Sequence, residues 1–287
     1  MQILIIIPAY NEEKSLKLSL DSLTHQTVLP KKVIIVNDNS TDTTENIIDE
    51  FSRNFAFIQK VTTQEKSEHI PGAKVVQAFY KGLSKAQLNE YDIVCKFDAD
   101  IIFPENYLEE ISAAYKNNKY LGMCSGLCYI ESKDGIWVYE PIADKDHTRG
   151  PIKSYSVECF NKMNGLRTSI GWDTVDELLA HYHNFETKTL KDLKVKHLRP
   201  TGNSYNKKAI RMQGEAMYKI RYGIIITVIA SLKMALKKRS YSVFYNNIAG
   251  YLEHSIKKTP YIVTNEEGVF IRKYRYAGIL KKLTGKH

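Results

Sequence analysis

Short apolar runs alternate with amphipathic stretches along the first 130 residues of this chain. Residues 3–7 (ILIII) form a continuous apolar run, which is typical of a parallel strand buried on both faces. Leucines at helical spacing follow in residues 11–24, and a second apolar run (VIIV) occupies residues 33–36. The alternation continues through strands expected at residues 91–97 and 121–130. Repeated alternation of strand and helix predicts an α/β fold with a doubly wound, mostly parallel sheet flanked by helices.

Further elements are expected between and after these runs. The earlier ones are a helix beginning at residues 40–42, a strand at 55–60, and helices beginning near residues 71 and 104. The pattern becomes irregular beyond residue 141, where we expect a surface loop at 140–153, helices at 156–163 and 174–183, and an edge strand at 193–198. Basic helices with apolar faces follow residue 206.

The 287-residue chain carries a formal net charge of +9, and its basic residues are concentrated near one end. From residue 205 onward there are 17 Lys and Arg against four Glu and no Asp. The first 204 residues hold 24 basic and 28 acidic side chains. This asymmetry predicts two regions, an α/β domain over residues 1–204 and a basic, amphipathic helical region over residues 205–287.

The basic region combines apolar helix faces with Lys, Arg and Tyr. Its longest apolar run, residues 223–232, is about half of the roughly 20 residues that a bilayer-spanning helix needs. Such helices are typical of proteins that lie in a membrane interface, so we expect a peripheral membrane protein. The alternative is a helical subdomain that packs on the sheet or forms a homodimer. Nucleic acid is not expected as a partner, because the region has no recognisable nucleic-acid-binding module.

Two further features predict a cytoplasmic protein on the inner face of the cell membrane. The cysteines do not have the spacing of a disulfide framework or of a zinc site, and we expect buried thiols at Cys95, Cys124, Cys128 and Cys159. The apolar run before Pro8 is short and has no basic segment in front of it, unlike a signal peptide.

Two aspartates separated by one residue follow the strand expected at residues 91–97. In an extended chain Asp98 and Asp100 would point to the same side, where like charges repel unless a cation lies between them. Asp38 follows the strand at residues 33–36, and doubly wound sheets bind ligands at the carboxyl ends of their strands. Carboxylate oxygens are ligands that Mg²⁺ and Mn²⁺ prefer. The alternative is that these aspartates cap a turn and begin the next element.

Four motifs occur in order within residues 7–100, and the resemblance that they carry extends over residues 1–197. They are IPAYNEE (residues 7–13), VNDNSTDTT (36–44), PGAKVVQAFYKG (71–82) and FDAD (97–100). As a set they resemble the nucleotide-sugar-binding domain of glycosyltransferase family 2, which has the GT-A fold. The resemblance implies a catalytic domain at residues 1–204 that transfers a sugar from a UDP- or GDP-linked donor.

The resemblance assigns donor-binding roles to residues at the ends of the first strands. The residues that would bind the nucleotide sugar are Pro8, Ala9, Tyr10, Glu12, Asp38, Lys74 and Asp98. Among them, Asp38 would accept a hydrogen bond from uracil or guanine, and Lys74 would approach the base or the diphosphate. Asn37 stands where the family commonly has an aspartate, so the resemblance does not determine which nucleotide base the donor carries. Glu12 has an alternative role, which is to complement the N-terminus of the helix that follows it.

The resemblance also implies a metal site. Asp98 and Asp100 would hold a Mn²⁺ or Mg²⁺ ion that bridges the donor diphosphate, and His197 would be a further ligand. We expect the neighbouring Lys194, Lys196 and Arg199 to form a solvated face.

A second group of candidate residues opens the helix expected at residues 174–183. In many family members an aspartate at the start of this helix is the general base, and Trp172-Asp173 occupies that place here. We therefore predict Asp173 as the base, Asp176 as the second candidate, and Trp172 as a stacking surface for an acceptor sugar. The alternative is that Asp173 only caps the helix and that Trp172 only packs.

These residues predict an inverting, metal-dependent glycosyltransferase that acts on a saccharide or lipid-linked acceptor in the synthesis of a cell-surface polysaccharide or glycolipid. Two alternatives stay open. One is an enzyme that passes a sugar directly to polyprenyl phosphate, and the other is a catalytically silent module that binds a sugar nucleotide or a membrane.

Overall fold

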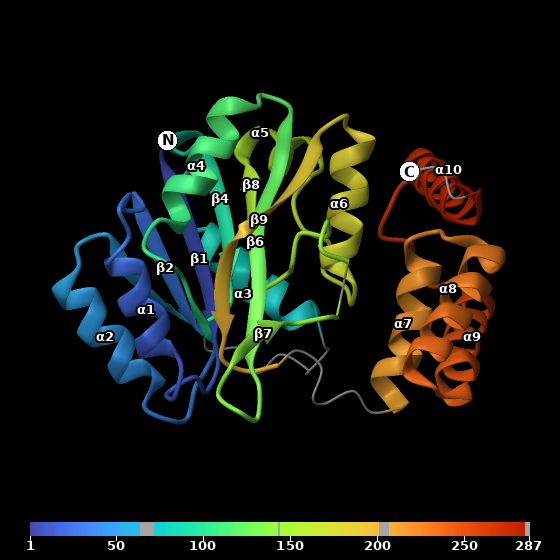
Figure 1. Cartoon of the computed structure of the whole chain (residues 1–287), viewed down its shortest axis with the longest axis horizontal. Helices are drawn as coiled ribbons and strands as arrows, with labels where there is room; N and C mark the ends of the chain where they lie inside the picture. The colour runs from blue at the N-terminus through green and yellow to red at the C-terminus, as the bar shows by residue number, and fades with distance from the viewer. Residues whose placement is uncertain (64–71, 143, 201–206, 285–287) are drawn as a thin grey trace. The chain divides into compact units, whose positions relative to one another are not determined.

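The computed structural model describes residues 1–63, 72–142, 144–200 and 207–284 (Figure 1). The chain divides into two compact units. The sheet unit comprises Met1–Leu166 and His183–Thr201, and the helical unit comprises Arg167–Tyr182 and Gly202–His287. The boundary predicted at residue 204 lies outside the described residues. Residues 167–182, which we expected in the first domain, belong to the helical unit.

The sheet unit contains a mixed sheet that has nine strands in the described residues. One half is parallel and consists, in spatial order, of β3 (Ile58–Thr62), β2 (Lys32–Asn37), β1 (Ile3–Ala9) and β4 (Ile93–Phe97). These are the strands that the apolar runs predicted. Because β1 pairs parallel with both β2 and β4, the loops that follow these three strands emerge at the same edge of the sheet.

The other half continues from β4 with antiparallel pairs, except that β6 and β9 pair parallel. It consists of β8 (Ile152–Ser156), β6 (Leu121–Glu131), β9 (Glu186–His197), β5 (Ile101–Ile102) and β7 (Trp137–Tyr139), which pairs with β6. Two expectations were wrong here. The last strand is not an edge strand of six residues, because β9 is 12 residues long and lies between β6 and β5. The stretch 140–153 is not entirely loop, because β8 begins at Ile152.

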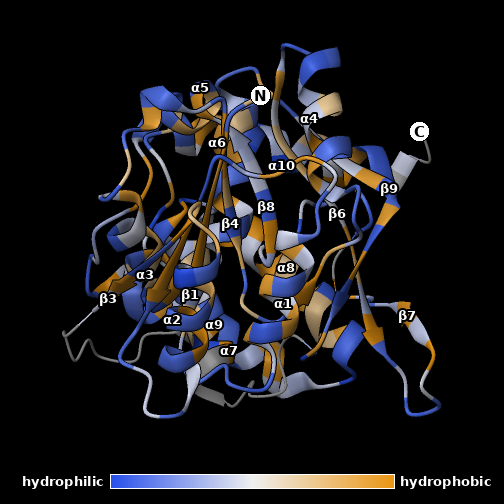
Figure 2. Ribbon diagram, turned by 90° about the vertical axis from the view of Figure 1, so that its left-hand side faces the viewer, coloured by the Kyte–Doolittle hydropathy of each residue, from blue (hydrophilic) through white to orange (hydrophobic). Residues whose placement is uncertain are grey.

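The helices of the sheet unit are α1 (Leu16–Thr24), α2 (Thr44–Asn54), α3 (Ala73–Leu83), α4 (Tyr107–Asn117) and α5 (Val157–Lys162), with a short 3₁₀ helix at Leu88–Glu90. A buried hydrophobic cluster joins β1 to α1, α2 and α4, and includes Ile3, Ile5, Ile7, Leu20, Ile48 and Tyr107. On the opposite face α3 lies close to the sheet, since a Cβ on Gly82 would be 2.7 Å from Cγ2 of Ile6. Helices therefore cover both faces, as an α/β fold requires, and the strands around β1 carry the hydrophobic colouring (Figure 2).

The helical unit contains α6 (Trp172–Tyr182), α7 (Lys207–Lys219), α8 (Gly223–Lys238), α9 (Tyr241–Ile256) and α10 (Asn265–Thr284). A capping box begins α10, in which the Thr264 amide donates to Glu267 (2.7 Å) and the Glu267 amide donates to the Thr264 hydroxyl (3.2 Å). Within the described residues no helix is both long and apolar enough to cross a bilayer. The four cysteines are buried thiols, as predicted.

Candidate active site

Asp38 lies where β2 ends, beside the end of β1. Its backbone amide donates to the carbonyl of Ala9 (2.8 Å), and its side chain accepts a hydrogen bond from Thr63 (2.8 Å). Nζ of Lys74, at the start of α3, is 3.2 Å from Oδ2 of Asp38 and 4.3 Å from the centre of the Tyr10 ring. Three residues from three motifs are thus brought together, with an exposed aromatic ring beside a buried carboxylate.

The loops after β1 and β2 hold each other in place. The Asn11 amide donates to the Ser40 hydroxyl (3.1 Å), and the Thr41 amide donates to the Asn11 side chain (2.8 Å). The Glu12 amide donates to the Thr44 hydroxyl (2.7 Å). Asn11 has a positive φ of 53°, a conformation that asparagine tolerates better than most residues. Pro8 and Ala9, the last residues of β1, and Tyr10, which follows them, are therefore next to a loop with a defined shape.

The two aspartates of FDAD occupy different environments just beyond β4. The Asp98 amide donates to the carbonyl of Pro151 (2.9 Å), and its half-exposed carboxylate forms an ion pair with Lys96. Asp100 is only 4% exposed, and its carbonyl accepts a hydrogen bond from the Leu198 amide (2.9 Å). The backbone on both sides of the motif is thereby fixed to neighbouring segments of the sheet unit.

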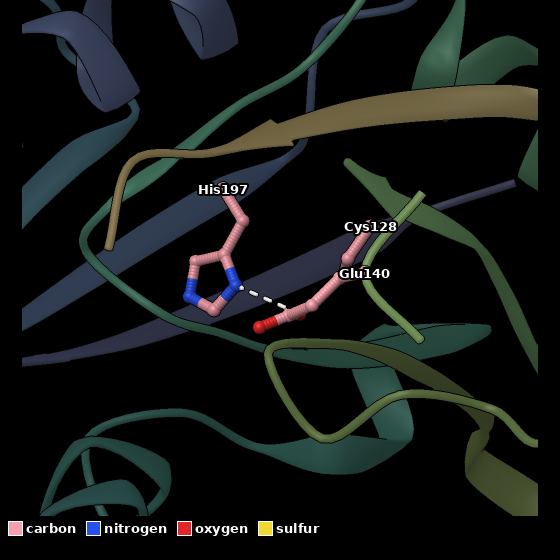
Figure 3. A group of neighbouring side chains, drawn as sticks. All are labelled: Cys128, Glu140 and His197. Carbon is pink, nitrogen blue, oxygen red and sulfur yellow. Dashed lines mark hydrogen bonds and ion pairs between the residues drawn. The ribbon is translucent and has the colours of Figure 1, made fainter. Parts of the chain in front are cut away.

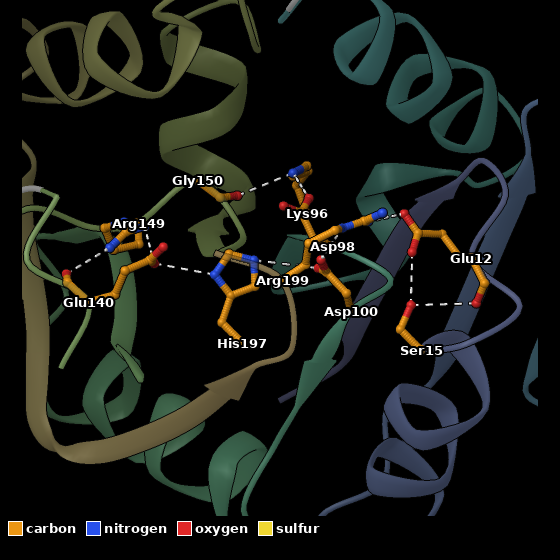
Figure 4. A network of polar contacts seen from close by, with 10 residues as sticks. All are labelled: Glu12, Ser15, Lys96, Asp98, Asp100, Glu140, Arg149, Gly150, His197 and Arg199. Atoms are coloured by element: carbon orange, nitrogen blue, oxygen red, sulfur yellow. Dashed lines mark hydrogen bonds and ion pairs between the residues drawn. The ribbon is translucent and has the colours of Figure 1, made fainter. Parts of the chain in front are cut away.

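Arg199 joins FDAD to the loop after β1 (Figure 4). Its Nε donates to Oδ2 of Asp100 (3.2 Å), and its Nη2 contacts the carboxylate of Glu12. The side chain is exposed, as a solvated face requires, but its charge is paired with two of the predicted site residues. This role was not predicted from the sequence, because a position two residues after a strand gives no signal of a partner 187 residues away.

His197 lies at the end of β9 between two carboxylates. Its Nε2 is 3.6 Å from Oδ1 of Asp100, and its Nδ1 is 3.2 Å from Oε2 of Glu140. Glu140 is in turn held by Arg149, whose Nη2 donates to Oε2 (2.6 Å) and whose Nη1 donates to the Glu140 carbonyl (3.4 Å). Figure 4 shows this chain of contacts running from Arg149 to Asp100, and Figure 3 shows the contact between Glu140 and His197. Glu140 and Arg149 were not among the predicted residues.

Electrostatics at Asp100 favour a cation. Burial, followed by the charge of Asp98, raises the pKa of Asp100 to about 6, although His197 and Arg199 lower it. Burial would lower the pKa of His197, but its hydrogen bond with Glu140 and the charge of Asp100 outweigh burial and raise it. Two carboxylates and an imidazole are a donor set suited to Mn²⁺ or Mg²⁺. Asp100 and His197 therefore lie close enough to share a divalent cation, whereas the carboxylate of Asp98 is paired with Lys96 in this structure.

A second set of potential ligands shares His197 (Figure 3). One ligand atom from each of Cys128, Glu140 and His197 lies within 4.8 Å of the others. Burial raises the pKa of the Cys128 thiol to about 12, so the sulfur is neutral at physiological pH. Oε2 of Glu140 is already shared by Arg149 and His197. This set is therefore better suited to support His197 than to hold a hard cation.

The candidate acceptor-side residues lie in the first turns of α6, in the helical unit. Trp172 is 6% exposed, Asp173 is half-buried, and Asp176 is fully buried. Oδ1 of Asp176 accepts a hydrogen bond from the Glu177 amide (2.7 Å). Asp173 is thus the more accessible carboxylate of the two, and Trp172 presents little surface for stacking.

Residues 4–219 match the family model described as Glycosyl transferase family 2. The match covers most of the chain, so this protein belongs to glycosyltransferase family 2, as predicted.

A relative and two solved structures illustrate the likeness. The poly-beta-1,6-N-acetyl-D-glucosamine synthase of Staphylococcus epidermidis is 28% identical over 133 residues, which are 46% of this chain and 29% of that protein. The chain thus aligns with less than a third of that relative's length. TarS 1–349 of S. aureus in complex with UDP-GlcNAc is similar with a TM-score of 0.57 and 19% identity, over 76% of this chain and 67% of that one. Mannosyltransferase PcManGT from Pyrobaculum calidifontis, in complex with GDP-Man and Mn²⁺, gives a TM-score of 0.55 and 15% identity over 100% of this chain and 88% of that one. Both structures show the GT-A fold for this chain.

Proposed function

We propose that this glycosyltransferase is an inverting, metal-dependent enzyme that transfers a sugar from a UDP- or GDP-linked donor. The observation that carries the proposal is the arrangement at one edge of the sheet. Asp38 follows β2 and contacts Lys74 at the start of α3, Asp98 and Asp100 follow β4, and His197 is the last residue of β9. Ligands of such sheets bind at this edge.

The donor's nucleoside would bind at the ends of β1 and β2. The carboxylate of Asp38 accepts a hydrogen bond from the base, while Thr63 and Lys74 fix its orientation. Tyr10 offers its exposed ring, and Pro8, Ala9 and Glu12 complete the surface around the ribose. These residues would bind and orient the donor, so that its anomeric carbon faces the acceptor.

The donor's diphosphate would lie beside FDAD. Asp98, Asp100 and His197 would hold Mn²⁺ or Mg²⁺, which supplies positive charge against the charge that develops on the departing diphosphate. In this structure Lys96 forms an ion pair with Asp98, and Arg199 forms one with Asp100. Mn²⁺ in the complex of PcManGT with GDP-Man supports this proposal.

Asp173 would act as the base. Its carboxylate removes the proton from the acceptor hydroxyl while that oxygen attacks the anomeric carbon from the face opposite the diphosphate. A single displacement inverts the configuration at that carbon. Asp176 is the second candidate for this role, and Trp172 would contact the acceptor.

The acceptor would be a saccharide or a lipid-linked molecule used for a cell-surface polysaccharide or glycolipid. Support comes from the polymer synthase among the relatives, and polyprenyl phosphate is the alternative acceptor. The basic charge from residue 205 onward supports a peripheral position on the inner face of the cell membrane, and a homodimer is the alternative use of that region.

Thermal unfolding with UDP and with GDP, each with and without Mn²⁺, tests the donor site. We expect one nucleotide to raise the free energy of unfolding by about 2.7 kcal/mol at 100 times its dissociation constant, and only when Mn²⁺ is present. Asp38→Asn is the test variant. It should reduce the nucleotide-induced increase in stability, because it removes the carboxylate charge beside Lys74. The absence of a shift with both nucleotides would instead support the silent module.

A further inference from the structure

The polarity of α8 is the reverse of that of a helix on the surface of a water-soluble domain. Its exposed residues include six large aliphatic side chains, Ile224, Ile225, Val228, Ile229, Leu232 and Leu236. Their spacing of one and four residues places them along one side of the helix. We refer to these six residues as the α8 aliphatic face.

The buried residues of α8 are small or polar except for Ile226. Thr227, Ser231 and Ala235 are all buried, and Thr227 donates to the carbonyl of Gly223 (2.8 Å). Asn247 is fully buried on α9, which packs on α8. Along α8, therefore, mostly small and polar side chains face the interior of the helical unit and aliphatic side chains are exposed. Small and polar residues between helices, with aliphatic residues facing outward, are typical of helices in contact with lipid.

Close backbone packing in the same unit follows this pattern. A Cβ on Gly214 of α7 would be 1.9 Å from the carbonyl oxygen of Asn247, and one on Gly250 of α9 would be 2.1 Å from that of Arg211. The two helices therefore touch through their backbones, and large apolar side chains do not separate them.

The length and charge of α8 indicate how it would meet lipid. Its 16 residues are too few to span a bilayer, so it can only lie along the surface. Lys233 and Lys237 are exposed on the same helix, and the region from residue 205 carries 17 basic side chains against four acidic ones. Apolar contact flanked by basic charge is complementary to a bilayer that contains anionic lipid.

We propose that the α8 aliphatic face docks on the surface of an anionic membrane. This proposal deepens the peripheral membrane position proposed above and rests on it. The match to the family model ends at residue 219, before α8 begins, so the face lies outside the matched segment.

Co-sedimentation of the full-length protein with vesicles tests the proposal. The vesicles are 30% phosphatidylglycerol in phosphatidylcholine, with pure phosphatidylcholine for comparison, and the test variant is Leu232→Glu/Leu236→Glu. Its matched control is Leu18→Glu/Leu29→Glu in the sheet unit, where the exposed fractions of 48% and 53% resemble the 51% and 70% of the test pair. We expect the test variant to lose at least about tenfold in affinity for anionic vesicles and the control to bind as the unsubstituted protein does.

Two results would overturn the proposal. One is equal vesicle binding by the unsubstituted protein and the test variant, or no binding by either. The other is a dimer in sedimentation equilibrium that becomes a monomer in the test variant, which would show that a second copy of the chain covers the face. The nucleotide-induced thermal shift of each variant, measured without lipid, separates a failure of this proposal from a failure of the donor site.

A separate observation concerns Glu140. An ionised carboxylate can only accept hydrogen bonds, so its contact with Nδ1 of His197 places the ring proton on Nδ1 and leaves Nε2 toward Asp100. Glu140 is itself fixed by two donors of Arg149, and both residues are buried. Carboxylates that accept from the second nitrogen of a ligating histidine orient the ring and increase its basicity.

The geometry assigns Glu140 as a positioning residue, which holds His197 with Nε2 toward the cation site of Asp98 and Asp100. Glu140→Gln should weaken Mn²⁺ binding, measured by electron paramagnetic resonance in the presence of UDP, by about 10–100-fold. The ¹⁵N NMR signals of the His197 ring should show a changed population of the two tautomers. Glu140→Gln removes the charge that forms an ion pair with the buried Arg149. If that variant does not fold, the double variant Glu140→Gln/Arg149→Gln, which removes both charges, takes its place in these measurements.

Cys128→Ala distinguishes this role from a metal site built by Cys128, Glu140 and His197. We expect Mn²⁺ affinity in Cys128→Ala to stay within about twofold of the unsubstituted protein. An equal loss in Cys128→Ala and Glu140→Gln would overturn the assignment, as would unchanged Mn²⁺ affinity and unchanged ring signals in folded Glu140→Gln.

Discussion

Asp100→Asn should lower kcat/KM by about 10²–10³-fold and abolish the dependence of activity on Mn²⁺. The substitution keeps the size of the side chain and an oxygen that can accept from Arg199, but it removes the charge that a cation requires. Asp192→Asn is the matched control, because Asp192 lies on the same sheet but is exposed. Mn²⁺ titration of initial rates measures both variants, and Mn²⁺-dependent activity in Asp100→Asn would contradict the metal site.

The same substitution should not destabilise the metal-free protein at pH 7.5. The pKa of Asp100, about 6, lies above its ordinary value of 3.8, so the folded protein binds this proton more tightly than the unfolded chain does. The ionised group therefore reduces stability above pH 6, and the reduction disappears as the pH falls toward 4. Removing the charge should therefore raise the free energy of unfolding by up to roughly 3 kcal/mol at pH 7.5. Thermal unfolding without metal measures this, and a large loss of stability would mean that the activity of Asp100→Asn reports unfolding.

The elements of the parallel half-sheet could be predicted because each has a local cause. The run at residues 3–7 is buried on both faces, and no other element could accommodate five consecutive large apolar residues so well. The strands of the other half, from β8 to β5, were harder to predict because they carry polar residues. Strand β8 has the sequence IKSYS and buries Lys153 and Ser154, so it shows no apolar run. Strand β9 contains register shifts against β6, which interrupt its alternation and hid its first seven residues.

The candidate site residues that lie in the sequence motifs could be predicted. The residues that contact them from irregular segments could not. Asp38 and Lys74 are 3.2 Å apart, as residues with a shared binding role should be. Glu140 lies in the stretch that we read as a loop, 57 residues from His197, and no periodicity links the two. Contacts of this kind depend on the path of the chain between β7 and β8, which local sequence preferences do not determine.

Asp173→Asn should lower kcat by about 10²–10⁴-fold without changing the affinity for the donor. Asp173 would act only on the acceptor hydroxyl, so losing its charge should leave the nucleotide-induced thermal shift as it is in the unsubstituted protein. Asp173 lies in the first turn of α6, where an acid also favours the helix dipole. If that were its only role, the substitution would cost about 0.3–1 kcal/mol of stability and leave kcat unchanged.

Asp176→Asn is the companion measurement because Asp176 is the second candidate on the same helix. Its buried carboxylate accepts from the Glu177 amide, and asparagine can keep that hydrogen bond through its carbonyl oxygen. We expect kcat of Asp176→Asn to exceed that of Asp173→Asn by at least about tenfold, because the half-buried Asp173 can be reached by an acceptor more readily. The reverse order would identify Asp176 as the base. Equal and unimpaired turnover in both variants would place the base outside α6, since proton removal from the acceptor needs a carboxylate or another base within hydrogen-bonding distance.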